Sequence, residues 1–204
     1  HVNSLTTVQK KMGFDSIHII PNSQNPLKIP MEGPSDEHRL ELVRLAFSTY
    51  GNAFHVNDCE LKRGGKSYTI DTVKELLKEY KSSELYLIIG ADNFENFSQW
   101  KDYKKLLELV NIVVTTRPGY QIPETETEWP DYLAPLVAES DFGSLELTTG
   151  RSVEFITLND LDISSSELRK KLRVGRPAEK FLPLAVERYI KEHGLYKTGS
   201  SKIS

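Results

Sequence analysis

The sequence lacks several features that mark secreted, membrane-spanning and zinc-binding proteins. It has 204 residues and one cysteine, Cys59, so an internal disulfide is excluded and a reducing cytoplasm is the expected compartment. No apolar run approaches the roughly 18 residues that cross a bilayer, which argues against a membrane protein. The five histidines are scattered without the paired spacing of zinc ligands. We therefore expect no metal site built from side chains of the protein.

The charge balance argues against a further class of proteins. The net charge is −3, so the chain has no excess of positive charge for binding nucleic acid or an anionic membrane. A local basic pocket is compatible with this balance. Hydrophobic residues make up 38% and charged residues 27%, which is typical of a water-soluble globular protein with a core.

Strands and helices are predicted to alternate along the chain. Segments rich in apolar residues predict strands at 17–20, 54–58, 85–89, 110–115 and 153–158. Residues with helical spacing lie between them, and two further helices are predicted at about 165–174 and 183–193. Several strands are continuously apolar, so the sequence predicts an α/β fold with a Rossmann-like, doubly wound parallel sheet and C-terminal helices.

One domain is predicted over residues 1–197, followed by a disordered tail at 198–204. Residues 121–150 show no clear period, are acidic and contain prolines, so they are predicted to form a long loop or weak helices. Around Cys59 the alternation predicts a strand in which the cysteine is half-buried and the acidic residues on either side face solvent.

Polar residues follow several of the predicted strands. Asn25 and Lys28 come after the first strand, Asp92 and Arg117 follow two later strands, and the segment 164–169 follows the last. In parallel sheets, ligands bind beyond the carboxyl ends of the strands. This placement predicts a binding or catalytic cleft at that edge.

The segment 163–169 places three serines at the start of a predicted helix and an arginine one turn later. The first N–H groups of a helix have no partner inside it and attract anions. Together with serine hydroxyls and an arginine fork they form a suitable phosphate site. The alternative is an ordinary serine N-cap with an exposed arginine.

Six segments then share one order and spacing with a known family. They are 65–72, 88–92, Trp100, 117–120, 163–169 and 182–196. In this arrangement they resemble bacterial nicotinate-nucleotide adenylyltransferases of the nucleotidyltransferase superfamily. His1 matches the last histidine of that superfamily's His-x-Gly-His signature, so the first strand and the glycine-rich loop are expected to be missing from the given chain.

The resemblance implies adenylyl transfer from ATP to nicotinate mononucleotide in NAD biosynthesis, with Mg²⁺ accompanying the ATP. His1 and Arg169 would be catalytic. The residues implied to bind ATP are His1, Ile163, Ser164, Ser165, Ser166 and Arg169.

The mononucleotide is implied to meet a second group of residues. Trp100 would stack on its pyridine ring, and Tyr68 and Thr69 belong to the family's substrate loop. Asp92 would bind a ribose hydroxyl or order the site, and Arg117 would meet a phosphate or carboxylate. Lys28 resembles a phosphate-binding residue, although the histidine expected just before it is a leucine in this sequence.

Three alternatives remain open from the sequence. In the first, the acceptor is nicotinamide mononucleotide, and in the second it is another phosphate-bearing compound. In the third, the chain binds nucleotides without catalysis. The sequence does not determine the oligomeric state, so a homo-oligomer is also left open.

Overall fold

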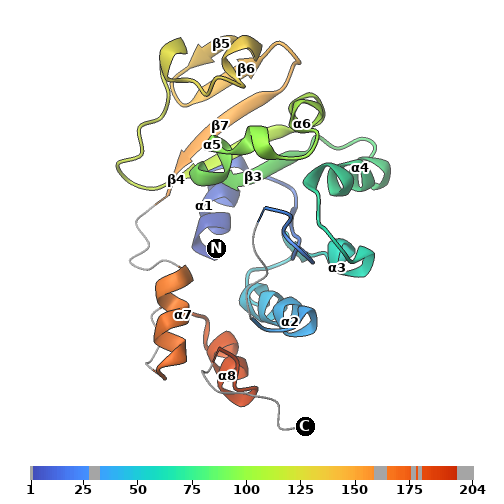
Figure 1. Ribbon diagram of the computed structural model, residues 1–204, viewed down its shortest axis with the longest axis vertical. Helices are drawn as coiled ribbons and strands as arrows, with labels where there is room; N and C mark the ends of the chain where they lie inside the picture. The colour runs from blue at the N-terminus through green and yellow to red at the C-terminus, as the bar shows by residue number, and fades with distance from the viewer. Residues whose placement is uncertain (1, 28–32, 159–164, 176–177, 179–180, 197–204) are drawn as a thin grey trace. The chain divides into compact units, whose positions relative to one another are not determined.

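The computed structural model describes residues 2–27, 33–158, 165–175, 178 and 181–196. It contains two compact units: unit 1 is His1–Lys66 together with Leu161–Ser204, and unit 2 is Ser67–Asp160. Unit 1 thus joins two stretches that are distant in the sequence, whereas unit 2 is one continuous stretch (Figure 1). The predicted tail at 198–204 lies outside the described residues.

Unit 2 is built on a five-stranded mixed sheet (Figure 1). In spatial order the strands are β3 (Tyr86–Gly90), β4 (Asn111–Thr116), β7 (Ser152–Thr157), β6 (Ser144–Leu147) and β5 (Val137–Asp141). The first three are parallel to one another, and β6 and β5 add an antiparallel hairpin at the edge. The predicted parallel sheet is therefore confirmed.

Strand β4 lies at the centre of the core of unit 2. Its residues Ile112, Val113 and Val114 have no exposed surface. Because successive side chains of a strand point to opposite faces, this run requires both faces of the sheet to be covered. The cover includes α4 (Thr69–Glu79), α5 (Ala91–Glu95) and α6 (Tyr103–Leu109), whose apolar residues join the strands in one cluster.

Unit 1 combines a short parallel strand pair with helices. Its elements are α1 (Val2–Met12), β1 (Ile17–Ile19), α2 (Asp36–Phe47), β2 (Phe54–Val56), α3 (Cys59–Arg63), α7 (Ser165–Arg173) and α8 (Leu184–Glu192). Helices α2 and α8 pack together although they are far apart in the sequence. His38 Nδ1 on α2 lies 2.9 Å from the hydroxyl of Tyr189 on α8, and the ring of Tyr189 stacks on that of His193 at 4.0 Å.

The structure corrects the prediction for residues 121–150. This segment contains two 3-10 turns, η2 (Glu126–Glu128) and η3 (Ala134–Leu136), followed by strands β5 and β6. Strand β5 is the edge strand of the sheet, and most of its residues are exposed. An edge strand with little buried surface has no apolar alternation, so its sequence does not predict a strand.

The strand predicted around Cys59 is wrong, although the cysteine is half-buried as expected. Cys59 opens the short helix α3, and Glu60 is buried rather than facing solvent. The side chain of Asn57 accepts a hydrogen bond from the backbone N–H of Cys59 at 3.0 Å, and Lys62 Nζ lies 2.9 Å from Asp58 Oδ1. A local Asn turn and an i,i+4 ion pair therefore start a helix where short alternation predicts a strand.

A paired substitution tests the buried core of unit 2. Phe94 has no exposed surface and packs edge-on against Phe155 at 5.4 Å between ring centroids. We expect Phe94→Ala to lower the free energy of unfolding by about 3–5 kcal/mol, because it leaves a cavity. The matched control is Phe142→Ala at the tip of the β5–β6 hairpin, where the side chain is 88% exposed.

The control should change stability by less than about 0.5 kcal/mol. Urea unfolding followed by circular dichroism measures both variants. Equal losses for Phe94→Ala and Phe142→Ala would contradict this description of the core.

Candidate active site

Two predicted site residues follow neighbouring parallel strands at the same edge of the unit 2 sheet. Strand β3 ends at Gly90 and Asp92 lies in the first turn of α5, while Arg117 directly follows β4. Gly90 pairs with Thr115 in parallel register, so both connections leave the sheet at its carboxyl edge. Both side chains are exposed. The structure therefore brings Asp92 and Arg117 to the sheet edge where ligands bind in α/β folds.

The Asp92 carboxylate folds back toward the end of β3. A Cβ atom placed on Gly90 would lie 2.8 Å from Oδ1 of Asp92. The backbone of Gly90 is extended, with φ −81° and ψ 159°, so any residue can adopt its conformation. A side chain at this position would displace the Asp92 carboxylate, so the absent side chain of Gly90 is what allows the carboxylate to approach.

Tyr68, Thr69 and Trp100 come from two segments of unit 2. Tyr68 immediately precedes α4, Thr69 is its first residue, and Trp100 ends the 3-10 turn η1 (Phe97–Gln99). The rings of Tyr68 and Trp100 are both partly buried against the apolar cluster. Lys101 joins the two segments, because its Nζ lies 4.4 Å from the centroid of the Tyr68 ring. The side chain of the residue next to Trp100 therefore contacts Tyr68.

Trp100 packs against a cluster of aromatic side chains in the interior of unit 2. The ring of Phe97 lies 5.1 Å from that of Trp100, and the ring of Tyr132 lies 6.1 Å from that of Phe97. The Tyr132 hydroxyl donates a hydrogen bond of 2.6 Å to the carbonyl of Phe94, and burial raises the pKa of this hydroxyl. Tyr132 belongs to the segment 121–150, for which the sequence gives no role. One contribution of that segment is to hold the turn that carries Trp100.

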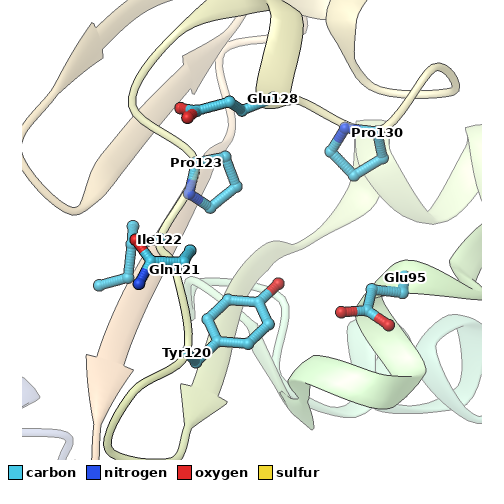
Figure 2. Close-up of a pocket in the computed structure, with 7 residues that line it drawn as sticks. All are labelled: Glu95, Tyr120, Gln121, Ile122, Pro123, Glu128 and Pro130. Carbon is cyan, nitrogen blue, oxygen red and sulfur yellow. The ribbon is translucent and has the colours of Figure 1, made fainter.

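A hollow of about 520 Å³ lies beside helix α5, which carries Asp92, and the loop that follows Arg117 (Figure 2). It is lined by Glu95, Tyr120, Gln121, Ile122, Pro123, Glu128 and Pro130. Figure 2 shows the ring of Tyr120 and the carboxylate of Glu95 at the same opening. Burial and the nearby charge of Glu95 both raise the pKa of the Tyr120 hydroxyl. None of the predicted site residues lines this hollow, although Glu95 and Tyr120 each lie three positions after one of them.

In unit 1 the serine-rich segment opens a helix, as predicted. Helix α7 begins at Ser165, and Arg169 lies one turn later and is partly buried. Burial raises the pKa of the Tyr196 hydroxyl, and the charges of Arg169 and Arg39 act in the opposite direction. The two guanidinium groups therefore lie near this hydroxyl. The remaining predicted ATP ligands His1, Ile163 and Ser164 lie outside the described residues, as does Lys28.

The described part of the chain contains no group of three His, Cys, Asp or Glu side chains placed to hold a metal ion. Within the same described residues, no helix has the length and apolar character needed to cross a membrane.

Comparison with known proteins agrees with this architecture. The cytidylyltransferase-like family model matches residues 1–171. The probable nicotinate-nucleotide adenylyltransferase of Geotalea daltonii is 36% identical over 200 residues, covering 98% of this chain and 92% of the relative. That of Citrifermentans bemidjiense is 39% identical over 185 residues, covering 90% and 85%.

A solved structure shows the same fold. It is the nicotinic acid mononucleotide adenylyltransferase of Plasmodium falciparum complexed with NaAD, which superposes with a TM-score of 0.67 at 17% identity. The superposition covers 95% of this chain and 90% of that chain. With the identity to the bacterial relatives across nearly the whole sequence, the conclusion is that this chain belongs to the nicotinate-nucleotide adenylyltransferase family.

Proposed function

We propose that this chain transfers the adenylyl group of ATP to nicotinate mononucleotide, giving deamido-NAD and pyrophosphate. The observation that carries the proposal is the 36% and 39% identity to two bacterial relatives over at least 90% of this chain. A cytoplasmic site of action belongs to the same proposal and is supported by the single cysteine. We also propose that residues 1–197 act as one nucleotidyltransferase domain, because the family model includes parts of both units.

The reaction is a direct displacement at phosphorus. An oxygen of the acceptor's phosphate forms a bond to the α-phosphorus of ATP. The bond between that phosphorus and the oxygen bridging to the β-phosphate breaks, and its electron pair leaves with pyrophosphate. No covalent intermediate on the protein is required. The protein therefore acts by positioning two anions and by compensating the negative charge of the leaving group.

We assign binding of the ATP phosphates to the start of α7 and to residues that match the same family motifs. The set is His1, Ile163, Ser164, Ser165, Ser166 and Arg169, with His1 and Arg169 acting in catalysis. The start of α7 at Ser165 supports this assignment, because its first N–H groups are donors without partners inside the helix. Mg²⁺ accompanies ATP in this proposal and supplies further charge compensation at the phosphates.

We assign binding of the mononucleotide mainly to unit 2. Trp100 stacks on the pyridine ring, and Tyr68 and Thr69 line the same site. Asp92 accepts hydrogen bonds from ribose hydroxyls, and Arg117 binds an anionic group of the nucleotide. Lys28 is assigned to phosphate. The exposure of Asp92 and Arg117 at one sheet edge supports this division.

The first experiment measures pyrophosphate release with ATP, Mg²⁺ and either nicotinate or nicotinamide mononucleotide, and identifies the product by mass. We expect release with the acid and a product of the mass of deamido-NAD. Release only with the amide would replace the acceptor in the proposal. A folded protein that binds ATP but releases no pyrophosphate with either acceptor would identify a nucleotide-binding protein without this activity.

Two substitutions should separate the proposed binding sites for the two substrates. Trp100→Ala should raise the KM for nicotinate mononucleotide about tenfold and leave the KM for ATP nearly unchanged, because it removes a stacking surface. Arg169→Ala should mainly impair use of ATP, because it removes a charged phosphate donor. Steady-state kinetics with each substrate varied in turn measures both effects. If either variant weakens both substrates equally, its assignment is wrong.

A substitution at Gly90 tests whether the position of the Asp92 carboxylate matters for activity. Gly90→Ala adds a methyl group that must displace the Asp92 carboxylate, and we expect kcat/KM for the mononucleotide to fall about tenfold. Asp92→Asn should give a loss of similar size. The control Asn93→Ala changes an exposed neighbour in α5 and should retain activity. Full activity in Gly90→Ala with wild-type thermal stability would show that the position of Asp92 is unimportant.

A further inference from the structure

Lys101 of unit 2 follows the residue assigned to stack on the pyridine ring and contacts a second aromatic residue assigned to the same site. Lys101 directly follows Trp100, and its Nζ lies 4.4 Å from the centroid of the Tyr68 ring. The same ammonium lies 3.4 Å from Oδ2 of Asp71 on α4. An ammonium over an aromatic face is held by the negative potential of the ring. Lys101 therefore places a positive charge next to an aromatic surface that a planar ligand can use.

The backbone fixes Trp100 and Lys101 next to each other on a tight turn. The N–H of Trp100 donates to the carbonyl of Phe97 at 3.0 Å, and the N–H of Tyr103 donates to the carbonyl of Trp100 at 3.2 Å. Between them Asp102 has φ 55° and ψ 36°, a left-handed conformation that few residues other than glycine adopt. This turn fixes the point at which the lysine side chain starts, directly after Trp100.

The ammonium of Lys101 is accessible to a ligand. The side chains of Lys101 and Asp71 are 46% and 40% exposed, so their ion pair is screened by solvent and weak. A carboxylate that arrives on a bound ligand can join this pair or replace Asp71 without the cost of breaking a buried interaction. The lysine carries three donors and no acceptor, so it favours an anionic group over a neutral amide.

We propose that Lys101 is a specificity-determining residue, whose ammonium binds the carboxylate of a pyridine ring stacked on Trp100 and so selects nicotinate over nicotinamide mononucleotide. The inference rests on the proposed function, which supplies the pyridine nucleotide as acceptor. The two mononucleotides differ only in a carboxylate against a carboxamide. A positive charge near this substituent favours the carboxylate, and the ammonium of Lys101, which lies over the Tyr68 ring, is such a charge.

This inference gives Lys101 and Arg117 separate tasks. If Lys101 meets the ring carboxylate, Arg117 is left to the phosphate, which both mononucleotides carry. Substitution of Arg117 should then weaken both acceptors by the same factor, whereas substitution of Lys101 should change their ratio. The two residues can be distinguished by this ratio even where each lowers activity.

The test compares Lys101→Met, Lys101→Arg and a matched control, Lys105→Met. Lys105 is a lysine of similar exposure, 53%, paired with Glu108 on the same helix. For each protein, calorimetry measures binding of both mononucleotides, and pyrophosphate release measures kcat/KM for both. Thermal unfolding checks that each variant is folded.

Lys101→Met should reduce the preference for the acid about tenfold, the loss expected for one charge-assisted hydrogen bond, with the amide little changed. Lys101→Arg should keep most of the preference, and Lys105→Met all of it. An unchanged ratio in Lys101→Met, or equal losses for both acceptors, would overturn the inference.

The calorimetric measurements test the role of Lys101 separately from the proposed function. Failure of the unsubstituted protein to turn over either acceptor would contradict the proposed function, and the ratio of the two affinities would still decide the role of Lys101.

Discussion

Burial of β4 on both faces is the constraint on which the rest of unit 2 depends. Three successive residues without exposed surface require cover on both faces of the strand, and the crossover from β3 to β4 supplies α5 and α6 to one of them. Parallel neighbours then end at the same edge, and the chain must turn there after β3 and again after β4. The polar residues at those turns, Asp92 and Arg117, are brought together by the need to cover an apolar strand.

The aromatic cluster extends this constraint to the proposed pyridine site. Phe155 on β7 packs against Phe94, and Tyr132 contacts both Phe94 and Phe97, which in turn packs against Trp100. The proposed stacking residue is thus connected to the sheet through contacts between rings. Side chains held by such packing lose little further freedom when a ligand binds, which favours affinity.

Much of the fold could be predicted because burial leaves a clear pattern. The apolar runs at 85–89, 110–115 and 153–158 correspond to β3, β4 and β7, and the serine-rich segment does start α7. Polar residues placed after those strands were enough to predict Asp92 and Arg117 at one edge, because parallel topology fixes where strand ends lie. Here the sequence determines the arrangement through backbone geometry alone.

Other features depend on contacts that leave no local pattern. The edge strand β5 is mostly exposed, so no alternation marks it, and α3 starts from an Asn turn and an ion pair. The contact of Lys101 with Tyr68 joins residues 33 positions apart, and the hollow beside Tyr120 is formed by separate loops. Adjacency to Trp100 was the one signal in the sequence that pointed to Lys101.

The interrupted course of unit 1 has a consequence for the order of events during synthesis. Unit 2 is continuous, so all of its residues have been synthesised before Leu161 and the helices that follow it. Domains generally fold as units during synthesis. Helix α2 is synthesised before α8, so the packing between them forms only after α8 has been made. This packing includes the contact between His38 and Tyr189. The sequence of the sheet unit is therefore complete while the first part of unit 1 is still without its partner helix.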